Sequence, residues 1–377
     1  MKGKQGMVCM GLLLVLSSCH TGKQITASGL QRKDFQTEVN GQHTDLFTLS
    51  NKQGMEVCIT NYGARVVSIL VPDRNGKRED VVCGFSTITE YMEQRQNFGS
   101  TVGRYIGRIL NARFTLDGVE YKLVPNNGKS GHISHGGNPG FADRMWKVEQ
   151  ADTHRVRLSY LSPDGENGFP GNLKVTLVYS LGEDDNALDL TYEATTDAPT
   201  VLNLSHHSFF NISGNFTKSV EDQQLWVGAD RFTPYDDKKC VTGEYLPVAG
   251  TPLDFRMPHA IGECIDADHP QLKVVNGYDH TWELNTKGDD TRPAAWVYDP
   301  ASGRKMEIFT TEPGMQIYTG NGLKGKMTGK RGIAYPFRSA VCFETMHFQD
   351  SPNQPGFPST VLRPGEVFRS HTVYKFE

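Results

Sequence analysis

Glu344 is the residue of this 377-residue chain with the clearest potential for chemistry. It lies in the run Val341–Phe348, whose β-branched and aromatic residues, followed by Pro, Asn and Gly, predict a strand that ends in a loop. Strand alternation places Glu344 on the same face as Cys342, Met346 and Phe348. A carboxylate there needs a partner, a ligand or water, because burying it alone is costly. Two interpretations stay open from the pattern: a solvated strand residue, or a general base at a substrate site.

Two adjacent histidines lie in another strand-like run. His207 lies in the strand-like run Val201–Phe210. Adjacent strand residues face opposite sides, so His206 and His207 cannot both point into one site. A glutamate that is ionised near neutral pH and a histidine that can be protonated make a suitable acid–base pair. A lone histidine in a strand is nevertheless more often a packed or surface residue.

Further polar residues lie in segments rich in glycine. Arg108 follows a glycine-rich run that lacks the spacing and the following helix of a phosphate loop, and a surface ion pair is its alternative role. His135 precedes two glycines, which indicate a loop where the backbone approaches another group closely. Asp279 could equally be a turn residue. His132 and His135 lack the further ligands of a metal site, so no metal site is predicted.

The elements that must position these residues are predicted to be strands. Three consecutive strands are predicted at Val156–Ser162, Leu173–Leu181 and Ala187–Thr195, with turn-rich loops between them and no helical pattern. Asp117-Gly118 predicts a tight hairpin turn, and Thr87–Gln96 predicts one short helix. Short strands at this spacing favour an all-β fold, a large antiparallel β-sandwich. Without a repeat or an internal linker, residues 34–377 are predicted to form a single domain.

Charge and cysteine content exclude several function classes. The formal net charge of -4 provides no basic field to attract nucleic acid. The 7 cysteines include no Cys-x-x-Cys motif, which argues against a zinc site or a dithiol redox site. Cys240 and Cys264 could pair in an exported protein. Apolar strand-like runs contain Cys58, Cys83 and Cys342, which are expected to be small buried residues.

The N-terminus predicts export. Residues 1–18 contain two lysines and then an apolar run that is too short to span a bilayer and matches a secretory signal. Leu16–Cys19 resembles the lipobox of bacterial lipoproteins, which implies cleavage before Cys19 and stable anchoring by several acyl chains. An ordinary signal peptide is the alternative. Residues 19–33 are polar and predict a lipidated tether. We therefore expect an exported, membrane-anchored bacterial lipoprotein that faces the periplasm.

Ordered sequence blocks carry a resemblance that covers nearly the whole mature chain. Together they resemble the aldose 1-epimerase (galactose mutarotase) family from about Phe47 to Phe376. Any one block is weak, and the presence of all of them in order makes the signal specific. The blocks are Phe98–Arg104, Phe114–Gly118, Asn126–Gly128 with His135–Gly137, Asp164–Glu166 with Phe169–Leu173, Asn203–Leu204 with His207–Asn211, Thr251–Arg256, Gly277–His280, Glu312–Gln316, and Phe343–Thr345 with Phe357–Ser359.

The resemblance implies a large β-sandwich and an isomerase that interconverts the α and β anomers of free aldohexoses such as galactose and glucose. Ring opening and reclosure by acid–base chemistry would need no organic cofactor, and a structural cation stays open. The resemblance implies Glu344 as general base and His207 as general acid. The substrate would be a free monosaccharide, and we expect a monomer. The implied substrate-binding residues are Arg108, His135, Asp279 and Gln316.

The chain departs from the family pattern at three positions. The family usually has Asn before the arginine that matches Arg108, and this chain has Gly107. The family often has Asn where this chain has His206, and Gln where it has Met346. These departures leave every implied catalytic group in place and bear on sugar specificity more than on reaction type.

Three other functions remain as alternatives. A carbohydrate-binding sandwich without catalysis would not need the acid–base pair. An epimerase of sugar phosphates would need additional cationic residues at its site. A glycosidase would need two carboxylates across the scissile bond, and Glu344 with Asp279 is the pair that the sequence offers.

Overall fold

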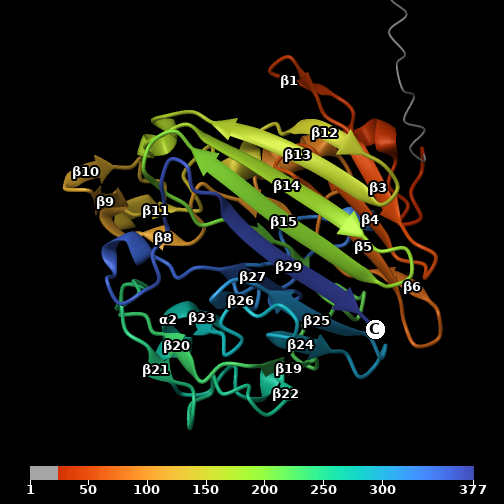
Figure 1. The fold of residues 1–377 in the computed structure, drawn as a ribbon. Coiled ribbons are helices and arrows are strands. Elements are labelled where there is room, and N and C mark those ends of the chain that lie inside the picture. Colours follow the sequence, from red (N-terminus) through yellow and green to blue (C-terminus); the bar gives the residue numbers. More distant parts are fainter. Residues whose placement is uncertain (1–23) are drawn as a thin grey trace, which may run out of the picture.

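The computed structural model describes residues 24–377, so the predicted signal segment and the lipidation site Cys19 lie outside the described residues. Most of the regular secondary structure consists of strands, whose neighbours in the main sheets pair antiparallel (Figure 1). The predicted all-β fold, a large antiparallel β-sandwich, is confirmed.

One wall of the sandwich is a long, twisted sheet. Within residues 24–377 it has nine strands. In spatial order they are β12 (Lys147–Ala151), β13 (Arg155–Ser162), β14 (Leu173–Leu181), β15 (Ala187–Thr196), β29 (Phe368–Phe376), β25 (Lys305–Thr310), β24 (Ala295–Tyr298), β19 (Gln224–Val227) and β22 (His259–Ala260). The three predicted consecutive strands are β13, β14 and β15. Their side chains alternate in burial because one face packs on the core and the other is more open to water.

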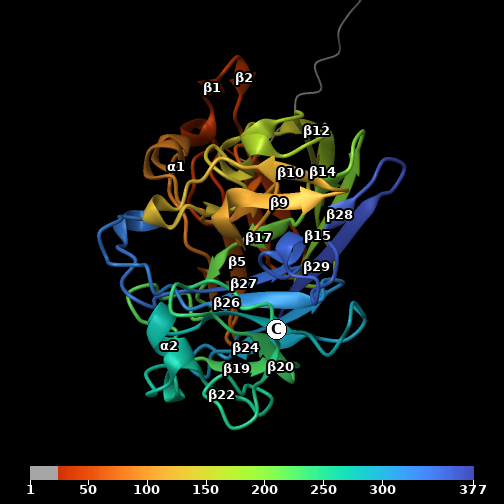
Figure 2. The ribbon, with the colours of Figure 1, turned by 90° about the vertical axis from the view of Figure 1, so that its left-hand side faces the viewer.

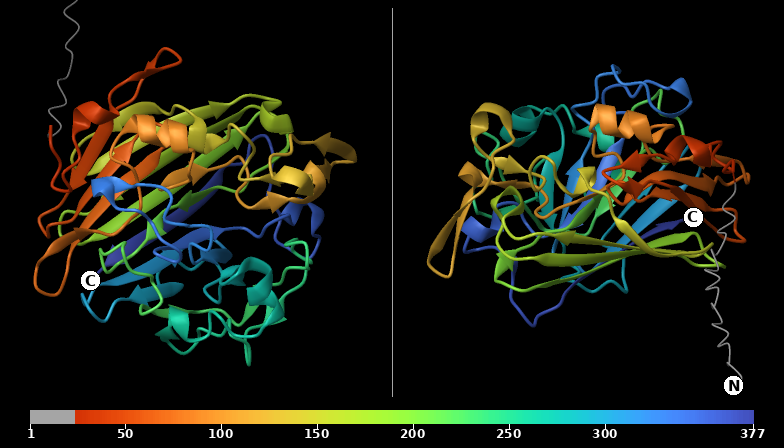
Figure 3. Two further views of the ribbon diagram at one scale, coloured as in Figure 1. Left: turned by 180° about the vertical axis from the view of Figure 1, so that it is seen from behind. Right: turned by 90° about the horizontal axis from the view of Figure 1, so that it is seen from above.

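Two further sheets pack against this wall. One contains β3 (Leu46–Ser50), β4 (Glu56–Thr60), β5 (Arg65–Pro72) and β6 (Arg78–Asp80). The other contains, in spatial order, β18 (Phe209–Phe210), β27 (Val341–Met346), β26 (Gly314–Tyr318), β23 (Asp279–Glu283), β20 (Arg231–Thr233) and β21 (Leu246–Pro247). In Figure 3, the orange strands lie over the yellow and green strands of the long sheet. The main core fills the space between the layers, with members such as Val66, Leu177 and Phe343.

Short strand pairs complete the fold. They are β1 (Glu38–Val39) with β2 (Gln42–His43), β9 (Arg113–Leu116) with β10 (Val119–Lys122), β8 (Arg108–Ile109) with β11 (Ile133–Ser134), β7 (Ser100–Val102) with β17 (Ser205–His207), and β16 (Thr200–Val201) with β28 (Val361–Leu362). The β9–β10 hairpin, visible in Figure 2, turns at Asp117 and Gly118 as predicted, with both residues at positive φ.

The prediction of one strand over Val201–Phe210 is wrong. The segment contributes to β16, β17 and β18, which belong to three different sheets. Its backbone partners change along the way, because Leu202 N donates to Thr360 O and Asn203 N donates to Arg104 O. A local pattern of apolar residues does not indicate where a segment changes its backbone hydrogen-bonding partner.

Helices are short. The predicted helix is α1 (Ile88–Gln94), which begins with a capping box between Thr87 and Glu90. The second α-helix among the described residues is α2 (Pro270–Val275). Single 3-10 turns are η1 (Arg32–Phe35), η2 (Leu110–Ala112), η3 (Gly128–Ser130), η4 (Phe141–Asp143), η5 (Glu166–Gly168), η6 (Ile261–Glu263), η7 (Lys330–Gly332) and η8 (Ser351–Asn353). Within residues 24–377, no helix has the length and apolar character needed to cross a bilayer.

The predicted tether is partly folded. Residues 24–33 pack on β4, where the Glu56 carboxylate accepts hydrogen bonds from Ala27 N at 3.0 Å and Ser28 N at 3.1 Å. Leu30 is buried, and the turn that follows buries Phe35 completely. This stretch therefore belongs to the folded domain rather than to a free spacer.

The cysteines of the described residues are all free. Cys240 and Cys264 therefore do not form the disulfide that the sequence allowed. The Cys240 thiol instead lies 3.2 Å from Nε2 of His132. Cys58, Cys83 and Cys342 are fully buried, as predicted for small core residues.

Candidate active site

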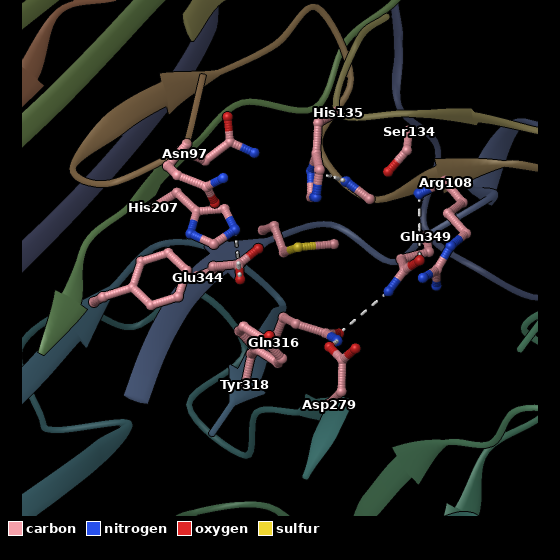
Figure 4. Close-up of a pocket in the computed structure, with 14 residues that line it drawn as sticks. Asn97, Arg108, Ser134, His135, His207, Asp279, Gln316, Tyr318, Glu344 and Gln349 are labelled. Carbon is pink, nitrogen blue, oxygen red and sulfur yellow. Dashed lines mark hydrogen bonds and ion pairs between the residues drawn. The ribbon is translucent and has the colours of Figure 1, made fainter. Parts of the chain in front are cut away.

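A cavity of about 240 Å³ lies over one face of the sheet that contains β23, β26 and β27. The structure brings all six site residues that were predicted from the sequence into its lining, although they come from six separate strands or loops (Figure 4). The lining residues are Gln96, Asn97, Gly107, Arg108, Ser134, His135, His207, Phe209, Asp279, Gln316, Tyr318, Glu344, Met346 and Gln349.

Strand register builds the floor of the cavity. Glu344 on β27 lies directly opposite Gln316 on β26, and Gln316 lies opposite Thr281 on β23. Cross-strand partners share a face of the sheet, so the side chains of these residues lie in one row. Asp279 joins them two residues before Thr281 on the same face. Asp279 is therefore a strand residue, and its alternative role in a turn is excluded.

The β8–β11 pair builds the wall opposite. Arg108 pairs with Ser134, and His135 follows with a φ of 52°. A Cβ on Gly136 would lie 1.9 Å from the carbonyl oxygen of Gly103, so this position admits only glycine. The predicted close approach of the backbone after His135 is confirmed.

His207 reaches the floor from β17. Its Nε2 lies 3.4 Å from Oε1 of Glu344, with both side chains almost completely buried. The imidazole stacks on Phe209 and meets the ring of His135 edge-on. Gly99 N donates to the carbonyl oxygen of His207 at 3.0 Å, which fixes the backbone from which the imidazole projects. The sequence left the proximity of Glu344 and His207 open, and the structure establishes it.

Burial sets the protonation of this pair. It raises the pKa of the Glu344 carboxyl well above its usual range, and the nearby Asp279 carboxylate adds to the shift. Burial lowers the pKa of His207 well below its usual range, and His135 adds to this shift. Burial therefore disfavours the expected ionised form of Glu344 and favours the uncharged form of each side chain.

The other end of the cavity is a network of polar side chains. Nε2 of Gln316 donates to Asp279 at 2.6 Å, while its Oε1 accepts from the Thr281 hydroxyl at 2.5 Å. Burial raises the pKa of Asp279, and Arg108 opposes that shift. Burial and Arg108 lower the pKa of His135 to about 4, so this imidazole is neutral at physiological pH and offers one donor and one acceptor.

Three potential metal ligands meet at the floor. Atoms of His207, Cys342 and Glu344 lie within 4.8 Å of one another. Burial raises the pKa of the Cys342 thiol well above its usual range, and Glu344 adds to this. A metal binds the thiolate rather than the thiol, so this trio is a poor site for a cation.

Comparisons with known proteins identify the family. The model of the family described as aldose 1-epimerase matches residues 45–375. The chain is 40% identical over 331 residues to galactose mutarotase of Bos taurus, with 88% of this chain and 93% of the relative covered. It is 36% identical over 340 residues to aldose 1-epimerase of Escherichia coli (strain K12), with 89% and 96% covered.

The chain belongs to the aldose 1-epimerase family. The fold agrees. A solved structure of an aldose epimerase homologue from C. elegans superposes with a TM-score of 0.81 at 31% identity and covers 89% of this chain and 99% of its own. A galactose 1-epimerase from Lactobacillus acidophilus NCFM gives 0.78 at 28% identity, with 90% and 96% covered.

The structure shows where two departures from the family pattern lie. His206 points away from the cavity into the core, where its Nε2 lies 2.6 Å from the Ser208 hydroxyl and its Nδ1 lies 3.4 Å from the Tyr179 hydroxyl. Burial lowers its pKa to about 3. Met346, by contrast, lines the cavity and gives it a thioether surface where the family often has an amide.

Several lining residues were not foreseen. Asn97, Ser134, Tyr318 and Gln349 line the cavity from loops and strand ends. Asn97 directly precedes a recognised block, and Gln349 lies three residues past the strand of Glu344. The only sequence signal for these residues was their position next to the blocks that carry the family resemblance. That position does not tell whether a side chain points into the cavity.

The raised pKa of Glu344 predicts an effect on stability. A carboxyl with a raised pKa in the folded state opposes folding above the pKa of the unfolded chain, because the unfolded glutamate ionises while the folded one resists ionisation. We expect Glu344→Gln to raise the free energy of unfolding near neutral pH by about 0.5–2 kcal/mol. The gain should shrink as the pH falls toward 4. Urea unfolding at both pH values measures it.

Glu56→Gln is the matched control. Glu56 is a buried carboxylate outside the cavity that accepts two backbone N–H hydrogen bonds, so its neutralisation should destabilise the fold. A Glu344→Gln protein that is no more stable than the wild type near neutral pH would contradict the assigned protonation.

Proposed function

We propose that this protein is an aldose 1-epimerase that interconverts the α and β anomers of free aldohexoses by opening and reclosing the sugar ring. The observation that carries the proposal is the 3.4 Å approach of His207 Nε2 to Glu344 Oε1 at the floor of a polar cavity. Membership of a family whose relatives are named galactose mutarotase and aldose 1-epimerase supports it.

The reaction requires two proton transfers at neighbouring atoms. The anomeric hydroxyl oxygen and the ring oxygen are both bonded to C1, so an acid and a base must converge on a small region. Glu344 takes the anomeric hydroxyl proton, the bond between C1 and the ring oxygen breaks, and C1 becomes an aldehyde. His207 delivers a proton to the ring oxygen. Rotation about the C1–C2 bond and reclosure with the roles reversed give the other anomer.

The electrostatics of the Glu344–His207 pair suit this scheme. Burial favours the uncharged form of each group, in which the proton is on Glu344 rather than on His207. Sugar hydroxyls that donate hydrogen bonds to the carboxylate would lower its pKa, and the proton could then pass to His207 across the short gap. The pair is uncharged overall in both arrangements, so no net charge must enter or leave the buried floor.

The remaining polar residues are proposed to hold the sugar. Arg108, Asp279 and Gln316 gather at the end of the cavity away from His207 (Figure 4). Charged groups there can make strong hydrogen bonds to sugar hydroxyls. His135 adds a neutral imidazole above the floor. These contacts fix C1 over the acid–base pair, which converts chance encounters into a positioned reaction.

The chemistry is proposed to need no cofactor. Mutarotation already proceeds in water, and two positioned proton-transfer groups, each contributing roughly 10²–10⁴-fold, supply a large acceleration. A glycosidase based on Glu344 and Asp279 is less favoured, because Gln316 holds Asp279 while His207 faces Glu344. A binding sandwich without catalysis does not require the buried acid–base pair.

Removal of either proton-transfer group should abolish most of the acceleration. We expect Glu344→Gln and His207→Asn each to lower kcat by roughly 10²–10⁴-fold. Polarimetry of freshly dissolved α-galactose, corrected for the spontaneous rate, measures this. His371→Asn is the control, because His371 is paired with Asp189 and Asp290 outside the cavity. Wild-type rates from Glu344→Gln would reject Glu344 as the base, and a wild type that binds galactose without acceleration would favour the binding function.

We also propose that the chain is exported and anchored to a membrane through lipid on Cys19, with its domain facing the periplasm. The proposal rests on the signal-like residues 1–18 and the lipobox-like Leu16–Cys19. Intact-mass analysis of the protein extracted from membranes should show a chain that begins at Cys19 and carries acyl groups. A Cys19→Ser variant should lose them, and a wild-type mass without acyl additions would reject lipidation.

A further inference from the structure

The side chain of Gln349 occupies the space above Gly107. A Cβ built on Gly107 would lie only 2.5 Å from Cγ of Gln349, a distance that real Cβ atoms do not show. Gly107 has a φ of 76°, a backbone conformation that asparagine tolerates better than most residues. Asparagine at position 107, the family's usual residue, therefore conflicts with Gln349 rather than with the backbone.

Gln349 presents its amide to the cavity. The residue is 4% exposed and lines the cavity beside Arg108 and Gln316. Its Oε1 accepts a hydrogen bond from Arg108 N at 3.2 Å, which leaves one lone pair of that oxygen unused. Its Nε2 donates to the Tyr235 hydroxyl at 2.7 Å and makes a longer contact of 3.3 Å to Gln316 Oε1. The long contact can be exchanged for a ligand oxygen at little cost.

We propose that Gln349 supplies an amide contact to a sugar hydroxyl, in place of the asparagine that the family usually has before its arginine. The inference rests on the proposed function and adds a specificity-determining residue to it. The amide enters from the loop after β27 instead of from β8, and it lies at the Arg108 and Asp279 end of the cavity (Figure 4). Glycine at position 107 makes room for the side chain of Gln349, so the loss of the family's asparagine and the presence of Gln349 belong together.

The position of Gln349 predicts which kinetic constant it affects. The amide lies away from His207, so it holds the sugar without taking part in proton transfer (Figure 4). A neutral hydrogen bond contributes about 0.5–1.5 kcal/mol, which corresponds to roughly 2- to 12-fold in affinity. We expect Gln349→Ala to raise KM for galactose by that factor and to change kcat by less than about 2-fold.

Deoxygalactoses test for a direct contact. Wild type and Gln349→Ala are compared on galactose and on its 2-, 3-, 4- and 6-deoxy analogues by polarimetry. The Gln349→Ala penalty should disappear for one analogue, the one that lacks the contacted hydroxyl, and persist for the others. A penalty of equal size on every analogue would show that Gln349 acts only through packing and would overturn the proposal.

An amide exchange provides a second arm. Gly107→Asn combined with Gln349→Ala restores an amide next to Arg108. It should return KM most of the way to the wild-type value. A double variant that is no better than Gln349→Ala on any sugar would contradict the exchange. Gln354→Ala is the control, because Gln354 lies in the same loop, bonds Asp350 and does not line the cavity. It should keep the wild-type KM.

The outcomes separate this inference from the proposed function. If the wild type does not accelerate mutarotation, the proposed function fails before Gln349 is tested. If the wild type is active and Gln349→Ala keeps its KM on every sugar, the inference fails alone. Circular dichroism of each variant confirms that a change in KM does not come from unfolding.

Discussion

The structure depends on one buried contact, the approach of the Glu344 carboxyl to the His207 imidazole. Both side chains are almost completely buried, and burial pushes their pKa values in opposite directions. Such a pair is unfavourable for stability unless it shares a proton and is held in place. The fold meets the second requirement by placing the two side chains on strands β27 and β17, whose residues are all buried. Function and rigidity are therefore linked at the same residues.

Different main-chain interactions position the two sides of the cavity. The floor is set by register, since Asp279, Gln316 and Glu344 come from adjacent strands of one sheet. The wall is set by close backbone packing at Gly136, which no side chain could enter. The end of β27 is tied to the neighbouring segment by Asn203, whose side chain bonds the N–H and the carbonyl oxygen of His347. Each interaction fixes a functional group from the main chain outward.

Local signals allowed much of the fold to be predicted. The alternating burial of β14, the capping box at Thr87 and the Asp117-Gly118 turn are all set by near neighbours in the chain. The break of the 201–210 segment into three sheets could not be predicted, because it depends on partners far away in the sequence. The same holds for Gln349, whose side chain meets Gly107 across 242 positions of chain (349 − 107). The family resemblance identified the six site residues, and their assembly into one cavity required the fold.

The central claim is that C1 of a bound aldose lies between Glu344 and His207. The most direct test is a crystal structure of the Glu344→Gln variant, which should bind without reacting quickly, in complex with galactose. The account predicts that the anomeric hydroxyl lies within hydrogen-bond distance of the side chain at position 344 and that the ring oxygen faces Nε2 of His207. A sugar with C1 at the Arg108 and Asp279 end, or one bound outside this cavity, would contradict it.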